Sequence, residues 1–287
     1  MIKDTGFPCE PNGRCSSICV GESRLALLFL LCAVSLPHSI DAQIIFPERF
    51  AVILDTTKVV KGQIVPEMKF QTQKERLLEF ENNANITFRL GDNALTFANK
   101  IEFSKYGDEV FLSGGYLYSE LRKIVGGSFV FEPYGQVHWS DARGMELRYA
   151  FGINARFRIR TTDNLGVFAG IGAFYEHEKW NYDGVADSSL IPSDVEHVKF
   201  TGAKVGFYLS IKYSPIRYLF FDSSIYHQGI PGDLFSTPRL ASSNGVTLSF
   251  TEHLGVTLIY QNIYDYAPLV PIDRLFTKVV TTLAVSF

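Results

Sequence analysis

The stretch MELRYAFGINARFRI, residues 145–159, alternates between two kinds of side chain. Every second residue from Met145 is apolar, and the positions between them are mostly polar and include three arginines. A period of two is typical of a β-strand with one dry face and one wet face. In a soluble barrel the apolar face lies inside. In a membrane barrel that face meets lipid and the arginines line the lumen. The alternation alone leaves both arrangements open.

The N-terminal segment predicts export. LALLFLLCAVSL, residues 25–36, is a 12-residue apolar core that follows Arg24. It is too short to span a bilayer as a helix, and a short apolar core after a basic residue is typical of a secretory signal. We predict that residues 1–42 are a signal peptide cleaved after Ala42. The 23 residues before Arg24 are long for such a signal, so translation is expected to start further in than Met1.

The cysteines and the charge balance exclude several classes of function. All four cysteines lie within residues 1–42, so the exported chain would contain no disulfide and no cysteine-based metal site. The formal net charge of −3 gives no case for nucleic acid as a partner. We therefore expect no metal, no cofactor and no nucleic acid.

Beyond residue 60 the same alternation recurs, and tight-turn signatures such as GDN at 91–93 separate the runs. We predict a short periplasmic segment at 43–61 and an all-β, antiparallel up-and-down transmembrane barrel at 62–287, with about 12 strands (10–12). The expected strands are about 62–72, 74–90, 95–104, 109–122, 127–140, 145–160, 164–180, 198–213, 217–229, 238–250, 254–266 and 274–287.

The connections between these strands fall into two classes. Connections after even-numbered strands are three to five residues long, such as TTDN at 161–164, whereas the long ones, 181–197, 230–237 and 267–273, all follow odd-numbered strands. Short turns on one side and long loops on the other are typical of outer-membrane barrels, with the short turns in the periplasm.

Strand length and aromatic placement favour the same class. Fifteen residues tilted by roughly 40° rise about 38 Å, which is enough to cross a bilayer. Aromatic residues near the strand ends, including Trp139, Tyr175, Tyr213 and Tyr260, share the apolar parity of their strands, as expected for interfacial girdles. The alternative is the core of a soluble barrel.

The C-terminal stretch VVTTLAVSF, residues 279–287, is an amphipathic strand that ends on Phe287. It resembles the signal that the barrel-assembly machinery of Gram-negative bacteria recognises. We therefore predict the outer membrane of such a bacterium as the location. The expected partners are that machinery, outer-membrane lipids and lipopolysaccharide.

A longer resemblance is carried by ALTFANKIEFSKYGDEVFLSGGYLYSELRK, by FEPYGQVHWSDARGMELRYAFGINARFRI, and by the ending VPIDRLFTKVVTTLAVSF. These stretches are similar to domain-of-unknown-function family 481, whose members are often labelled putative salt-induced outer-membrane proteins. The resemblance covers most of residues 60–287. It implies a fold and a location, but no activity and no site residues.

The predicted lumen face holds the candidate site. Its lining candidates are Arg148, Arg156, Arg158, Arg160, Glu176 and Glu178. Pairing about the turn at 161–164 brings Arg148 beside Glu176 or Glu178. The same pairing sets Arg156 and Arg158 opposite glycines and Phe168, where they face open space.

Two accounts of these arginines remain open. In the first, they join Glu79, Glu81, Glu102 and other lumen acids in a network that fills a narrow barrel, which makes the protein structural. In the second, Arg156, Arg158 and Arg160 form a positive stripe that favours anions in a narrow channel.

A different function class is suggested by HWSDARG, residues 138–144. His138 and Ser140 resemble the catalytic pair of barrel enzymes that deacylate lipid A, in which a histidine activates the hydroxyl. Asp141 replaces the usual Asn, and the parity of His138 and Ser140 points to the lumen or the extracellular rim, away from acyl chains. We therefore expect a non-enzymatic protein, with a membrane-embedded hydrolase as the alternative.

Overall fold

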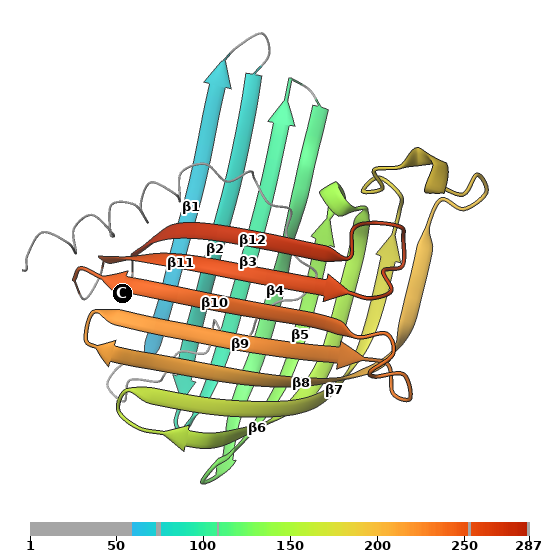
Figure 1. The fold of residues 1–287 in the computed structure, drawn as a ribbon. Helices are drawn as coiled ribbons and strands as arrows, with labels where there is room; N and C mark the ends of the chain where they lie inside the picture. The colour runs from blue at the N-terminus through green and yellow to red at the C-terminus, as the bar shows by residue number, and fades with distance from the viewer. Residues whose placement is uncertain (1–58, 73–75, 108, 252–253, 286–287) are drawn as a thin grey trace, which may run out of the picture. The chain divides into compact units, whose positions relative to one another are not determined.

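The computed structural model describes residues 59–72, 76–107, 109–251 and 254–285. Twelve antiparallel strands form one sheet in chain order, curled into a half-barrel (Figure 1). The strands are β1 (Val60–Thr72), β2 (Arg76–Leu90), β3 (Asn93–Tyr106), β4 (Glu109–Gly126), β5 (Phe129–Ser140), β6 (Met145–Thr161), β7 (Leu165–Trp180), β8 (Val198–Ile216), β9 (Leu219–Gly229), β10 (Arg239–Ser249), β11 (Leu254–Asp265) and β12 (Leu275–Val285). The expected signal peptide at 1–42 and Phe287 lie outside the described residues.

The predicted fold class and the strand count are confirmed, and the differences lie at the strand ends. β4 continues to Gly126 and β8 to Ile216, beyond the predicted ends at 122 and 213. The ladders shift register between Ile124 and Gly126 and between Tyr213 and Ile216. Such bulges let the chain remain paired through residues that look like a turn in the sequence.

The long connections all lie at one end of the strands. β7 and β8 are joined by residues 181–197, β9 and β10 by 230–238, and β11 and β12 by 266–274. Apart from the strands, the described residues include two single-turn 3₁₀ helices, η2 (Asp141–Arg143) and η3 (Ser188–Leu190), both at this long-loop end. No helix in the described part of the chain is long and apolar enough to cross a membrane.

Burial settles which face of the sheet is apolar. On β6 the exposed fraction is 55% for Phe151 and 61% for Ile159, whereas Arg148 is 1% exposed and Arg156 5%. The same pattern, with apolar side chains exposed and charged ones buried, holds on β7, where Ile171 and Tyr175 are exposed and the glutamates are buried. Polar side chains therefore fill the concave side and apolar ones cover the convex side. This arrangement is expected of a barrel whose outer solvent is lipid.

The apolar outer face leads to a depth-dependent prediction. Ile153 lies at the middle of β6 and is exposed, so Ile153→Arg should cost about 2–4 kcal/mol of folding free energy in vesicles. Leu147, near the end of the same strand and on the same face, provides the control. Leu147→Arg should cost about 0–1 kcal/mol because it lies near the interface. Urea titration of both variants in lipid vesicles measures the difference, and equal costs would contradict the outward orientation.

Candidate functional site

The polar interior near the long-loop end is organised around the β6–β7 hairpin. Arg148 lies opposite Glu178 in the ladder. Its Nε donates to Glu176 Oε1 at 2.6 Å and lies 3.4 Å from Glu178 Oε1. All three side chains are buried. The predicted pairing of Arg148 with a carboxylate of its own hairpin is confirmed, and both candidate acids take part.

Residues of more distant strands complete this cluster. Arg239 of β10 donates from Nη1 to Glu178 Oε1 at 2.8 Å and from Nε to Asp265 Oδ2 of β11 at 2.9 Å. Lys204 of β8 donates to Glu176. We call Arg148, Glu176, Glu178, Lys204, Arg239 and Asp265 the outer ion cluster. Three bases and three acids balance its charge, as a buried ionic cluster requires.

The loops cover the outer ion cluster. Trp180 donates from Nε1 to Glu178 at 3.0 Å and packs with Met145 and Val270 in an apolar group from three loop-end segments. The guanidinium carbon of Arg143 lies 3.6 Å from the centre of the Phe276 ring and 5.7 Å from that of Trp180. Burial lowers the pKa of Arg143 to about 9. This end of the interior is therefore tightly packed.

A second group lies further along β6 toward the short turns. Glu132 of β5 is within 3.2 Å of Arg122 Nε and 3.4 Å of Arg156 Nη1, and it accepts a hydrogen bond from Tyr208 at 2.9 Å. Tyr208 lies over Gly170, where a Cβ would meet its ring at 2.0 Å. A larger residue at position 170 would therefore require the Tyr208 ring to move.

The sequence-based expectation for Arg156 is therefore only partly correct. It lies opposite Gly170, as predicted, and it borders a cavity at the short-turn end, but its side chain is buried against its neighbours. Its guanidinium carbon lies 4.0 Å from the centre of the Phe168 ring, and Glu132 is its acidic neighbour. Hairpin pairing within β6 and β7 could not show this, because the carboxylate comes from β5 on the other side of β6.

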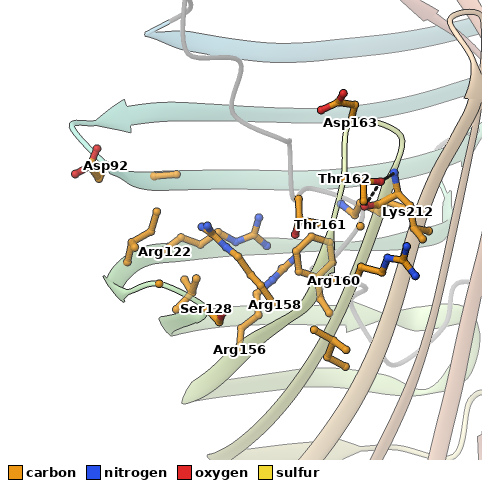
Figure 2. Close-up of a pocket in the computed structure, with 18 of the residues that line it drawn as sticks. Asp92, Arg122, Ser128, Arg156, Arg158, Arg160, Thr161, Thr162, Asp163 and Lys212 are labelled. Carbon is orange, nitrogen blue, oxygen red and sulfur yellow. Dashed lines mark hydrogen bonds between the residues drawn. The ribbon is translucent and has the colours of Figure 1, made fainter.

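The short-turn end contains a cavity of about 850 Å³. Its lining includes six basic side chains from four strands, Arg89, Arg122, Arg156, Arg158, Arg160 and Lys212, and two acidic ones, Asp92 and Asp163. Figure 2 shows the labelled arginines of β4 and β6 gathered beside the cavity, with Lys212 farther along it. Hydroxyl groups of Ser128, Thr161 and Thr162 also line it. We call these residues the basic vestibule.

Arg158 and Arg160 differ from the other arginines of the vestibule. Arg158 is half-buried and lies opposite Phe168, while Arg160 is exposed. Among the described residues, neither guanidinium forms an ion pair with a carboxylate. Their charges are therefore available to a mobile anion. Guanidinium groups bind carboxylate and phosphate oxygens well because their donors form a fixed fork.

In the described residues, Glu81 and Glu102 form ion pairs with Lys100 of β3, and not with the arginines of β6 as the first of the two accounts expects. Glu102 pairs with Lys100 at 2.5 Å, and Glu81 lies 3.6 Å from the same ammonium group. The carboxylates that contact the arginines include Glu120, which is 2.6 Å from Arg122 Nε, and Glu132. The interior is thus filled by ion pairs over part of its length and left with excess positive charge at the short-turn end.

The candidate hydrolase residues lie deep in the interior. His138 and Ser140 are 1% and 2% exposed, on the polar side of β5. His138 lies opposite Arg148, with its ring centre 6.3 Å from that of Tyr116. Neither side chain reaches the apolar outer face, where acyl chains would lie. In the described ranges, no group of three or more His, Cys, Asp or Glu residues is placed to hold a metal ion.

Comparisons with known proteins give distant structural similarities. No family model matches the chain, and no curated protein matches it, so the resemblance to family 481 stays a prediction. A solved structure of the KdgM porin in complex with disordered oligogalacturonate is similar at 10% identity over 80% of this chain and 99% of that chain, with a TM-score of 0.42. The NanC porin is similar at 10% identity over 80% and 98%, with a TM-score of 0.41. The CymD monoaromatic hydrocarbon channel is similar at 8% identity over 78% and 77%, with a TM-score of 0.39.

Proposed function

We propose that this protein is a non-enzymatic outer-membrane barrel of a Gram-negative bacterium that forms a narrow, anion-preferring channel. The observation that carries the proposal is the pair of guanidinium groups, Arg158 and Arg160, that line the basic vestibule without a carboxylate partner among the described residues. A cavity lined by one sign of charge in a low-dielectric wall concentrates ions of the opposite sign.

The interior along β6 is divided between an open cavity and packed ion pairs. From the short-turn end, the interior passes from the vestibule at Arg160 and Arg158 to the Glu132 group at Arg156, and then to the outer ion cluster at Arg148. An anion entering from the periplasmic side would meet excess positive charge first and balanced ion pairs afterwards. We therefore expect a small conductance, with the anion preference set at the vestibule.

Planar-bilayer recording of the purified protein tests the proposal. We expect discrete conductance steps. In a salt gradient, their reversal potential should be shifted toward the equilibrium potential of the anion, because the vestibule charge favours anions. Protein that inserts into the bilayer but gives no steps would instead support a structural barrel, in which the ion pairs fill the interior.

The proposed assembly through Phe287 can be tested separately, by measuring insertion into outer membranes after that residue is removed.

The hydrolase alternative makes an opposite prediction about Ser140. Ester hydrolysis by the purified protein is expected to be absent, and Ser140→Ala should leave conductance unchanged, because Ser140 is buried outside the vestibule lining. Release of fatty acid from lipid A in detergent, measured for the protein and for the variant, checks this. Hydrolysis that disappears in Ser140→Ala would overturn the proposal of a non-enzymatic protein.

A further inference from the structure

On the outer face of β6, β7 and β8, the type of side chain changes from row to row toward the long loops. The ladder registers align side chains of this face in rows across the three strands. From the middle of the strands outward, the rows are Ile153–Ala173–Val205, Phe151–Tyr175–Ala203, Tyr149–His177–Thr201 and Leu147–Lys179–Lys199. The sequence of rows is thus apolar, aromatic, polar and then cationic.

The aromatic and polar rows are joined by direct contacts. Phe151 stacks on Tyr175 with ring centres 5.9 Å apart, and Tyr149 stacks on His177 at 5.0 Å. His177 Nδ1 lies 2.6 Å from Thr201 Oγ1. Stacked aromatic rings at this depth are typical of the level where acyl chains end and headgroups begin. The cationic row lies one step further out, at the level of headgroup phosphates.

The two lysines of the cationic row lie directly opposite each other. Lys179 of β7 pairs in register with Lys199 of β8, which places their Cβ atoms about 5 Å apart. Like charges in this position are destabilising, and an anion bound between the two ammonium groups would offset that repulsion. Glu146 offsets part of this charge, because it accepts from Lys179 and lies 2.6 Å from His197. Lys199 is exposed and has no acidic partner among the described residues.

From these observations we infer that Lys179 and Lys199 bind the phosphate group of an outer-leaflet phosphoglycolipid of the lipid A class. This inference rests on the proposed orientation, in which the long loops face the cell exterior. The two ammonium groups would hold the phosphate, and His177 and Thr201 would lie at the level of the sugar. The stacked rings of Tyr149, Phe151 and Tyr175 would contact the first carbons of the acyl chains.

Native mass spectrometry of the full chain, extracted from membranes in mild detergent, provides the test. The added lipids are diphosphoryl lipid A, its dephosphorylated form and phosphatidylglycerol. We expect lipid A to be retained in preference to the other two. Lys179→Gln with Lys199→Gln should weaken its binding by about tenfold or more, since the variant removes both charge-assisted bonds to the phosphate.

Two further variants make the result specific. Lys199→Gln alone removes a charge that has no ion pair among the described residues and should still weaken binding severalfold. Lys105→Gln is the matched control, because Lys105 lies near the same end of β3 but opposite Leu78 and Val110, with no lysine beside it. It should leave lipid A binding unchanged.

Equal retention of phosphatidylglycerol or of dephosphorylated lipid A would overturn the inference, as would lysine variants that bind like the wild type. Bilayer conductance of the variant with both lysines replaced separates the test of lipid A binding from the test of the channel proposal. Neither lysine lines the vestibule, so loss of lipid A binding with conductance unchanged is the expected combination. A protein that never conducts but still retains lipid A would contradict the channel and leave the lipid site standing.

Discussion

Replacing Arg158 and Arg160 together by glutamate is expected to turn the preference of the channel from anions to cations. Both side chains line the vestibule, and neither pairs with a carboxylate in the described part of the chain. The double replacement exchanges two positive charges for two negative ones in a cavity of about 850 Å³. Even at an effective dielectric constant of 20, a single charge 4 Å from an ion contributes about 4 kcal/mol. The local preference should therefore reverse.

The reversal potential in a salt gradient measures this effect, and Lys123→Glu is the matched control. Lys123 lies at the short-turn end of β4, exposed, opposite Phe131 and outside the vestibule lining. The Lys123→Glu substitution changes the net charge at the same end of the sheet without changing the lining of the cavity. The control should keep the anion preference. An unchanged reversal potential in the arginine variant would show that the vestibule does not select the ion.

Removing the carboxylate of Glu178 is expected to be the most destabilising single change in the interior. Glu178 accepts bonds from Arg239 at 2.8 Å and from Trp180 at 3.0 Å, and it lies 3.4 Å from Arg148. Glu178→Ala would leave two buried guanidinium groups short of a counter-ion. Breaking a buried ionic group in this way costs about 3–5 kcal/mol.

Urea unfolding in lipid vesicles measures that cost, with Glu196→Ala as the control. The Glu196 side chain is 93% exposed and lies 3.9 Å from His197, so its removal should change the free energy of unfolding by about 0–1 kcal/mol. A loss for Glu178→Ala no larger than this would mean that Glu178 is hydrated and is not held in a packed ionic cluster.

Much of the fold could be predicted from the sequence because strands and hairpins depend on residues that are close together along the chain. Alternation within a strand and the length of a turn fix a hairpin, so the turn at 161–164 placed Arg148 beside Glu176 or Glu178 and Arg158 opposite glycines and Phe168. The ladder confirms Phe168 for Arg158 and selects Glu178 for Arg148. The strand ends were harder to predict from the sequence. Bulges such as the one after Ile124 interrupt the two-residue alternation of apolar and polar side chains.

The rest of the site depends on contacts between segments that are distant along the chain. Arg239 reaches Glu178 although 61 residues and two intervening strands separate them. That contact depends on how far the sheet curls, which alternation does not encode. Arg143 lies in η2 and packs against Phe276 of β12, and no local pattern marks it as buried. The acidic neighbour of Arg156 was missed for the same reason, since Glu132 belongs to the preceding hairpin.

The central claim is that the apolar face of β6 meets lipid and its arginine face lines the interior. A cysteine scan of residues 146–159 tests it most directly, in a chain whose four native cysteines, all at positions 9–32, are replaced by serine. Each variant in vesicles is labelled with a fluorophore and exposed to a quencher fixed to the acyl chains. The account predicts strong quenching at 147, 149, 151, 153, 155, 157 and 159, and weak quenching at the positions between them. Strong quenching at 148, 154, 156 and 158 with weak quenching at the apolar positions would contradict it.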